Sequence, residues 1–329
     1  MTLEAATAPA GYYLDSLLAP LAPWLKRGDV TDIYVNRPQE VWVETLGGAI
    51  EAHACVALTE PVLARLSRQI AAASAQGISR EHPLLAATLP DGSRVQVVAP
   101  PATRGFHAFA IRRHVAASLS LEDYEKQGAF DEVSLKDAQL ENEARLVPVP
   151  AIDVRASLRE AVRARRNMLI SGGTSTGKTT FLNALLREVP AEERLILIED
   201  TPELELTHRN AVGLLAARSA LGEAEVTAED LLMAALRMRP DRIILGELRG
   251  SEAFTFLRAV NTGHPGSMTT IHADTPQRAV EQLALLVLQA GSRLVREDVR
   301  HYVLESIDVF VQLERHAGRR RVAQMLVRR

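Results

Sequence analysis

One stretch near the middle of the chain decides its fold: Gly172-Gly173-Thr174-Ser175-Thr176-Gly177-Lys178-Thr179. It fits the pattern G-x-x-x-x-G-K-[ST], which forms a phosphate-binding loop when a strand leads into it and a helix leads out. The apolar run Met168–Ile170 precedes it, and the residues from Thr180 to Arg187 have a helical composition. This context predicts a strand, a phosphate loop and a helix in succession, rather than a glycine-rich turn that precedes Lys and Thr by chance.

The residue types of this loop suit the binding of a triphosphate. Glycines allow the backbone to curl until successive N–H groups point at the phosphates, and the helix that follows adds the partial positive charge of its N-terminus. Lys178 is expected to reach the β- and γ-phosphates, and the Thr179 hydroxyl is expected to hold Mg²⁺. We therefore predict that residues from Gly172 to Thr180 bind nucleotide, with ATP and Mg²⁺ as the ligands.

The chain beyond residue 150 alternates short apolar strands with amphipathic helices. Strands are expected at Asn167–Ser171, Arg194–Glu199 and Arg242–Leu245. Thr227 followed by Asp230 is typical of a capping box, Thr275 before a proline is typical of a helix start, and residues 308–327 fit a closing hairpin. The alternation predicts an α/β domain over residues 151–329, in which helices sandwich a mostly parallel sheet.

The first third of the chain follows a different pattern, and we assign residues 1–115 to a smaller N-terminal α+β domain. Helices are expected at 14–25 and 59–76, and strands at 31–35, 40–45, 94–99 and 107–113. Residues 116–150 are polar and acidic, lack a persistent period and end in Val147-Pro148-Val149-Pro150, which favours an extended path. We interpret them as a linker between the two domains.

Composition excludes several classes of protein. Hydrophobic residues make up 47% and charged residues 24%, as in an ordinary globular protein, and the net charge is −3. Aromatic residues amount to only 4%, and no basic field is evident, so no direct nucleic-acid binding is expected. The single cysteine, Cys55, excludes an intramolecular disulfide framework and any Cys-Cys metal site.

Nothing in the sequence predicts export or insertion into a membrane. Residues 1–14 lack the basic start and long apolar stretch of a signal peptide. No apolar run approaches the length that crosses a bilayer. The chain is therefore expected in the cytoplasm, with peripheral contact to a membrane left open.

An acidic side chain follows the strand expected at Arg242–Leu245. Glu247 comes after Gly246 at the carboxyl end of that strand, and ligands of parallel α/β sheets bind at this edge. A carboxylate within one water's reach of the γ-phosphate can act as a general base. Together with the phosphate loop, this position favours Glu247 as the base over a merely solvated glutamate.

A second acidic stretch, Ile198-Glu199-Asp200-Thr201-Pro202-Glu203, also follows a strand. Its carboxylates repel one another unless a cation or an arginine relieves them, so bound Mg²⁺ and a solvated turn are both open interpretations. Farther along, His264 and His272 have no partner at metal-site spacing. A neutral histidine near the γ-phosphate and a satisfied core histidine fit the local sequence equally.

Four motifs in this order carry a resemblance to a known family: the phosphate loop, the acidic stretch, Arg237 to Arg249, and Gly263 to Ala273. The chain resembles the secretion traffic ATPases, and most closely the ring ATPase of type IV secretion and conjugation systems. The likeness runs from about Gly11 onward. It implies a RecA-like P-loop ATPase domain joined to the N-terminal domain, with six copies forming a ring and nucleotide lying between the two domains.

The resemblance also implies roles for single residues. Glu203 is similar to the acidic-box glutamate near Mg²⁺ and water, Glu247 to the Walker B glutamate, and His272 to the histidine that senses the γ-phosphate. Arg94 and Arg112 are similar to N-terminal-domain arginines that clamp the phosphates, which suits the fit of guanidinium to phosphoryl charge. Without the resemblance both arginines would be interpreted as surface residues. The choice between Glu247 and Glu203 as base stays open.

The family further implies partners: other ATPases and inner-membrane channel components of a secretion machine, at the cytoplasmic face of the inner membrane. Whether the N-terminal domain docks on its own or on a neighbouring subunit's ATPase domain stays open. One alternative is a motor for pilus assembly or retraction, or for type II secretion. The single cysteine disfavours the type II assembly ATPases, which carry four metal-binding cysteines. A nucleic-acid translocating module and a nucleotide-switched scaffold are further alternatives.

Overall fold

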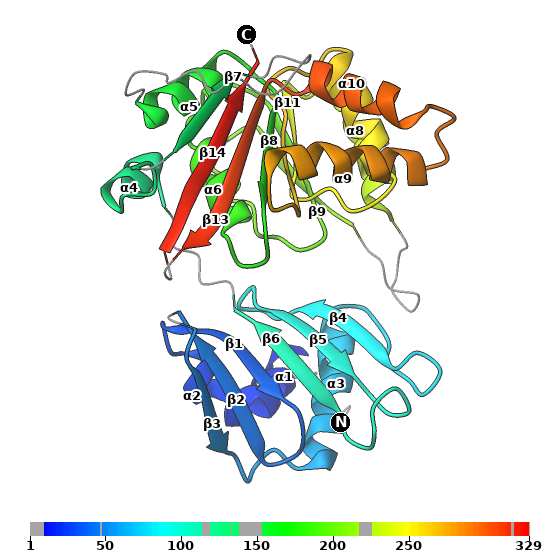
Figure 1. The fold of residues 1–329 in the computed structure, drawn as a ribbon. Helices are drawn as coiled ribbons and strands as arrows, with labels where there is room; N and C mark the ends of the chain where they lie inside the picture. Colours follow the sequence, from blue (N-terminus) through cyan, green and yellow to red (C-terminus); the bar gives the residue numbers. More distant parts are fainter. Residues whose placement is uncertain are drawn as a thin grey trace, which may run out of the picture. The chain divides into compact units, whose positions relative to one another are not determined.

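The structure is a computed structural model that describes residues 10–46, 48–113, 119–131, 133–137, 153–216, 226–316 and 319–328. The chain divides into two compact units. The first unit holds the described residues up to Arg113, and the second holds those from Leu119 onward (Figure 1). Within the described residues, no helix has both the length and the apolar character needed to span a bilayer.

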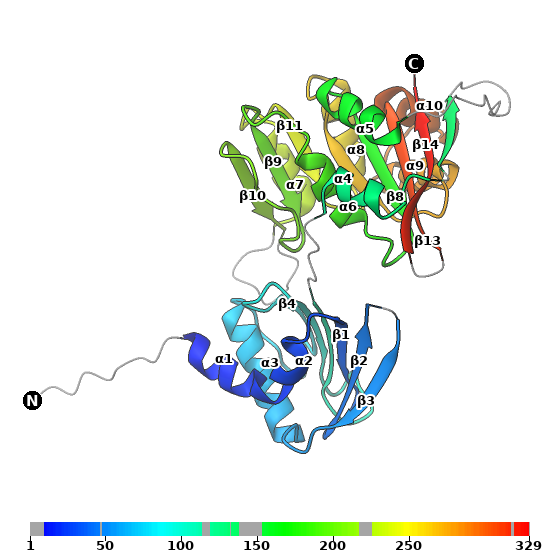
Figure 2. The ribbon, with the colours of Figure 1, turned by 90° about the vertical axis from the view of Figure 1, so that its left-hand side faces the viewer.

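The first unit is an antiparallel sheet with helices on one face (Figure 2). Its strands are β1 Val30–Val35, β2 Glu40–Thr45, β3 Ile50–Ala54, β4 Leu84–Thr88, β5 Arg94–Val98 and β6 Ala108–Arg112, in the order β3-β2-β1-β6-β5-β4. The helices are α1 Ala10–Leu18, η1 Ala19–Leu21, α2 Ala22–Leu25 and α3 Glu60–Ala73. Alternate strand residues such as Ile33 and Val97 pack against Leu63 and Leu66 of α3, so one face of the sheet forms the core.

Two expectations for this unit need correction. The single helix expected over 14–25 is split into α1, η1 and α2 because Pro20 and Pro23 lack the N–H that a continuous helix requires. Strands β3 and β4 were not predicted, and both lie at the edges of the sheet, where partial exposure leaves a weaker apolar pattern.

The second unit has an eight-stranded sheet in the order β10-β9-β11-β12-β8-β13-β14-β7. Every neighbouring pair is parallel except β13 and β14. The strands are β7 Ser134–Asp137, β8 Met168–Gly172, β9 Leu195–Glu199, β10 Ala211–Leu215, β11 Arg242–Leu245, β12 Met268–Ile271, β13 Val309–His316 and β14 Arg319–Val327. The mostly parallel sheet predicted for this part of the chain is therefore present.

Helices cover both faces of this sheet (Figure 1). They are α4 Leu121–Lys126, α5 Val154–Arg163, α6 Lys178–Leu186, α7 Ala228–Ala235, α8 Glu252–Asn261, α9 Pro276–Gln289 and α10 Arg296–Ser306. Leu232, Phe256 and Leu283 fill one face, and Leu158 and Phe181 fill the other. Buried on both sides, the central strands are continuous apolar runs, which is why the sequence revealed them.

The segment expected as a linker, 116–150, differs in its first part. Ser120 and Asp123 form a capping box that starts α4, and Tyr124 packs edge-on against Phe181 of α6 with ring centroids 5.2 Å apart. Strand β7 then pairs with β14. Long-range packing therefore builds this part into the second unit, although its polar sequence lacks a period. The remainder, including Val147–Pro150, lies outside the described residues.

Candidate active site at the carboxyl edge of the parallel sheet

The phosphate loop joins β8 to α6 through two left-handed residues, Ser175 with φ 62° and Gly177 with φ 88°. The Thr176 hydroxyl donates to the Gly173 carbonyl at 2.8 Å and closes the turn. A methyl group on Gly172 would lie 2.5 Å from Thr176 Oγ1 and 3.0 Å from the Leu313 carbonyl oxygen, so only glycine fits there. The backbone thus has the tight curvature that a phosphate cradle requires. Helix α6 starts at Lys178, two residues earlier than the helical run predicted from Thr180.

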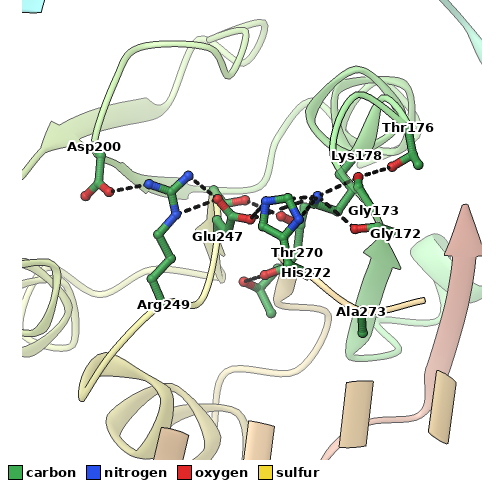
Figure 3. Close-up of polar contacts among 12 residues, drawn as sticks. Gly172, Gly173, Thr176, Lys178, Asp200, Glu247, Arg249, Thr270, His272 and Ala273 are labelled. Atoms are coloured by element: carbon green, nitrogen blue, oxygen red, sulfur yellow. Dashed lines mark hydrogen bonds and ion pairs between the residues drawn. The ribbon is translucent and has the colours of Figure 1, made fainter. Parts of the chain in front are cut away.

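Lys178 is folded onto the loop that carries it and is 9% exposed. Its Nζ donates to the carbonyls of Gly172 at 3.0 Å and Gly173 at 3.3 Å, and it lies 4.0 Å from Glu247 Oε1 (Figure 3). Burial lowers the pKa of Lys178, the negative charges of Glu247 and Glu203 oppose this shift, and the positive charge of Arg249 adds to it. Among the described residues this buried amine contacts neutral acceptors and a carboxylate 4.0 Å away, so it is poised to donate to phosphate oxygens instead.

Glu247 lies just past β11, where the chain crosses close to β9. The Gly246 N–H donates to the Ile198 carbonyl at 2.8 Å, and a methyl group on Gly246 would meet Glu199 Cβ at 3.4 Å. The Glu247 side chain is largely buried at 15% exposure. Arg249 grips its Oε2 with a two-nitrogen fork, in which Nε donates at 2.6 Å. The other oxygen, Oε1, is thereby turned toward Lys178 and His272 (Figure 3).

His272 follows β12 and bridges the lysine and the glutamate. Its Nδ1 lies 3.2 Å from Lys178 Nζ, and its Nε2 lies 2.9 Å from Glu247 Oε1. Burial lowers the pKa of His272, Lys178 and Arg249 lower it further, and Glu247 acts against them. A neutral ring can accept from the lysine through Nδ1, whereas the Nε2 contact lacks hydrogen-bond geometry, so Glu247 Oε1 has no hydrogen-bond partner among the described residues. Of the two interpretations left open for this histidine, the geometry favours the one beside the phosphate loop.

The acidic stretch after β9 uses its first carboxylate for its own backbone. Glu199 Oε2 accepts from the N–H groups of Glu203 and Leu204, each at 2.9 Å. Asn183 of α6 then donates to the Glu203 carbonyl at 3.0 Å and accepts from the Glu205 N–H at 3.0 Å. The turn that carries Glu203 is therefore fastened directly to the phosphate-loop helix.

The mutual repulsion expected within the acidic stretch is relieved in part by an arginine. Arg249 Nη1 donates to Asp200 at 3.3 Å while the same guanidinium grips Glu247. Nowhere in the described ranges do three His, Cys, Asp or Glu side chains gather as a metal site. Mg²⁺ beside a nucleotide typically takes one or two protein ligands, with phosphates and waters supplying the rest. The pair predicted for it, Thr179 and Glu203, suits that mode and stays a prediction.

Arg94 and Arg112 lie in the first unit as direct neighbours on β5 and β6. Arg112 Nε donates to Asp32 of β1 at 2.9 Å, which holds this guanidinium at the sheet surface. The sheet thus places two arginines side by side, one of them paired with a carboxylate. Their predicted role as a phosphate clamp stays a prediction.

Sequence reasoning missed three residues that shape the site. Asn183 joins α6 to the acidic turn, and Arg249 orients Glu247. Thr270 of β12 fixes the strand end by donating to the Gly246 carbonyl at 2.8 Å and accepting from the Leu248 N–H at 2.9 Å. Only Arg249 left a signal in the sequence, because residues two apart in an extended segment share a side.

Comparisons of sequence find relatives over nearly the whole chain. The profile of the family described as "Type II/IV secretion system protein" matches residues 16–317. The chain is 39% identical over 326 residues to the type IV secretion system protein VirB11 of Bartonella henselae, covering 94% of this chain and 91% of that one. It is 40% identical over 329 residues to the type IV secretion system protein PtlH of Bordetella pertussis, covering 96% and 95%.

Solved structures agree on the fold. The VirB11 ATPase of the Brucella suis type IV secretion system, solved with sulphate, shares 36% identity and a TM-score of 0.50, covering 95% of this chain and 97% of that one. The pilus retraction motor PilT with bound ADP shares 19% identity and a TM-score of 0.61, covering 96% and 83%. The expected fold class, a RecA-like P-loop ATPase domain with a smaller N-terminal α+β domain, is confirmed.

Proposed function

The chain belongs to the type II/IV secretion system protein family, and on that premise we propose that it is an ATPase that powers a bacterial type IV secretion machine. The proposal rests on three side chains that come together at the phosphate loop. Lys178 from the phosphate loop, Glu247 from the end of β11 and His272 from the end of β12 meet within 4.0 Å at one edge of the parallel sheet. A buried cation and a carboxylate beside a phosphate cradle are the groups that phosphoryl transfer to water requires.

The reaction is in-line attack of water on the γ-phosphorus of ATP. The new bond joins the water oxygen to phosphorus, the bond to the β,γ-bridging oxygen breaks, and ADP and phosphate leave. Glu247 takes the proton of the attacking water through Oε1, the oxygen that Arg249 leaves available. Lys178 exchanges its loop carbonyls for the β- and γ-oxygens and stabilises their charge. Glu203 is the alternative base.

Mg²⁺ would neutralise charge on the phosphate oxygens, with the Thr179 hydroxyl and Glu203 as its protein ligands. The negative charges of Glu203 and Glu247 both act to raise the pKa of the buried Lys178, which is consistent with both carboxylates lying near the phosphate loop. His272 lies between Lys178 and Glu247 and can report the arrival of a γ-phosphate, since displacement of Lys178 removes the partner of its Nδ1.

We further propose that six copies form a ring and that Arg94 and Arg112 of the N-terminal domain clamp the phosphates, which would couple hydrolysis to domain movement. The domain boundaries proposed for this motion are 1–115 and 151–329. The ring would work at the cytoplasmic face of the inner membrane, together with other ATPases and channel components of the machine. Mass measurement of the purified protein with and without ATP tests the ring.

The test of the enzymatic proposal is Mg²⁺-dependent release of phosphate from ATP by the purified full chain, with and without lipid. Lys178→Ala should abolish turnover because it removes the buried amine that is proposed to reach the β- and γ-oxygens. An unchanged melting temperature in the variant would show that the fold survives. A wild-type chain that binds ATP but releases no phosphate under any of these conditions would leave a nucleotide-switched scaffold as the better description.

A pilus motor is the second candidate and shares the fold, but its solved representative is only 19% identical. The relatives named for type IV secretion reach 39–40% over nearly the whole chain. We therefore favour secretion. Genes for channel components beside this gene would support it, and pilin genes in that place would reverse the preference.

A further inference from the structure

The closing hairpin extends beyond the edge of the sheet at which the phosphate loop lies. Strand β13 pairs with β8 up to Leu313, which stands opposite Gly172, and then continues for three residues to His316. Strand β14 returns from Arg319, with Arg320 paired to Arg315. The overhanging part of the hairpin therefore stands beside the phosphate loop.

Arg320 lies directly against that loop. A methyl group on Gly177 would come within 3.0 Å of Arg320 Cδ, 3.4 Å of Nε and 3.6 Å of Nη1. Neighbouring Arg321 instead pairs with Glu314 at 2.5 Å. Among the described residues, Arg320 makes no ion pair or side-chain hydrogen bond, and its exposed side chain lies against the loop. A guanidinium kept at a phosphate-binding turn without a carboxylate partner has its donors available for an anion.

The order of strands fixes which end of a nucleotide this arginine would meet. Strands β9, β11 and β12 lie on one side of β8, and they carry Glu203, Glu247 and His272 at their ends. Strands β13 and β14 lie on the other side. A triphosphate bound across the loop with its γ-phosphate toward Glu247 has its nucleoside end toward the hairpin.

We propose that Arg320 is a further nucleotide-binding residue that contacts the α-phosphate of ATP and ADP. This inference rests on the proposed ATPase function and deepens it. The α-phosphate does not change during hydrolysis, so the contact is equally strong in the ground state and the transition state. Arg320 therefore contributes to affinity, whereas Glu247 and Lys178 contribute to the chemical step.

The experiment compares Arg320→Ala with Arg319→Ala in the purified full chain. Arg319 is the matched control, because it carries the same charge on the same exposed strand but projects from the opposite face. Arg320→Ala should raise the Kd of both ATP and ADP about tenfold, the usual effect of losing a charged hydrogen bond. Turnover at saturating ATP should stay at the wild-type level, and Arg320→Lys should recover part of the affinity. Inorganic pyrophosphate has no α-phosphate linked to a nucleoside, and we expect it to bind at the β- and γ-sites and to compete equally well in all variants.

Three outcomes would overturn the inference while the fold is intact by thermal melting. Equal nucleotide affinity in the Arg320→Ala and Arg319→Ala variants would show that Arg320 does not contact the nucleotide. If Arg320→Ala also weakened the binding of pyrophosphate, Arg320 would contact the β-phosphate and not the α-phosphate. A fall in saturated turnover without a change in Kd would make it part of the chemical step. If the wild-type chain itself fails to bind ATP, the proposed function fails first, and that result is distinct from these three.

Discussion

An arginine–glutamate ion pair lies at each end of strand β11, and the two pairs differ in burial and in the partners around them. At the amino end, Arg242 is fully buried and forks onto Glu193 at 2.7 and 2.9 Å. At the carboxyl end, Arg249 forks onto Glu247 but is 44% exposed. The same pair of residue types is therefore structural at one end and is proposed to serve catalysis at the other. The difference lies in how many further protein groups hold each pair in place.

The amino-end pair is closed on all sides. Arg242 Nη1 also donates to the Val162 carbonyl at 2.7 Å and lies 3.4 Å from the Gly266 carbonyl oxygen. Gly266 has φ 80°, and a methyl group there would lie 2.7 Å from the guanidinium, so no other residue fits. A buried ion pair with its hydrogen bonds satisfied holds the starts of β11 and β12 in register but offers nothing to a ligand.

The carboxyl-end pair is open by comparison. Arg249 divides its donors between Glu247 and Asp200, and Glu247 Oε1 faces a lysine 4.0 Å away. Lys178 in turn holds carbonyl oxygens that a phosphate can replace. The two ends therefore differ in whether the partners of the charged pair can be exchanged for a ligand, and only the end proposed to be catalytic has such partners.

The largest expected effect is at the carboxyl end. Glu247→Gln should lower kcat by about 10²- to 10⁴-fold, the usual contribution of a general base, because the amide cannot take the proton of water. ATP should still bind, and the melting temperature should stay near that of the wild type. Phosphate release and nucleotide titration measure both. Wild-type turnover in this variant would transfer the role of base to Glu203.

The next effect concerns the amino end and should appear in stability alone. Arg242→Ala leaves the buried Glu193 without its two-nitrogen fork, with only the partly exposed Arg165 3.3 Å away, and should lower the free energy of unfolding by about 3–5 kcal/mol. Urea denaturation reports the loss as a shift of the midpoint. The double variant Arg242→Met with Glu193→Leu is the control and should recover most of it, since no charge is then stranded. A single variant as stable as the wild type would contradict the structural role of this end.

A smaller effect is expected from the arginine that positions the base. Arg249→Ala should lower kcat about 10- to 100-fold by releasing Glu247, with little change in KM. Arg249→Lys keeps the charge but loses the fork, so its kcat should be intermediate. Stability should move by no more than about 0.5 kcal/mol because the side chain is largely at the surface. Equal losses of stability in Arg249→Ala and Arg242→Ala would erase the proposed difference between the ends.

The smallest effect is a pH dependence at the amino end. Burial acts to raise the pKa of Glu193, but the hydrogen bonds and charge of Arg242 outweigh it, and the pKa is lowered from its ordinary 4.5. A lowered pKa in the folded state gives stability that is present above the ordinary value and is lost as pH falls through the folded value. The free energy of unfolding of the wild type should therefore exceed that of Glu193→Gln by less as the pH falls below 4.5. A difference that stays constant down to about pH 3 would argue against this linkage.

Local sequence signals were sufficient for much of this fold. The phosphate loop is a contiguous motif, the buried strands are continuous apolar runs, and the capping box of Thr227 and Asp230 lies within four residues. All three depend on neighbours along the chain, and the structure contains all three. Glu247 could be singled out because it follows a recognisable strand, whereas the local sequence of His272 fitted two interpretations and only the family resemblance implied its role.

What sequence could not supply is register between distant segments. The fork of Arg249 on Glu247 depends on how β11 ends against β9, and the position of Arg320 depends on pairing between residues about 140 apart. Helix α4 was hidden for the same reason, because core residues far along the chain, Phe181 among them, bury Tyr124. Such contacts arise from tertiary packing and leave no periodic trace.

The buried amide of Asn183 has a mechanical consequence. Its nitrogen donates to the Glu203 carbonyl and its oxygen accepts from the Glu205 N–H. Two hydrogen bonds from one side chain therefore fix the acidic turn to α6. A helix fastened in this way cannot tilt or retract without carrying the attached turn along. A movement of α6 when nucleotide binds or leaves would therefore displace the turn that carries Glu203 by the same amount.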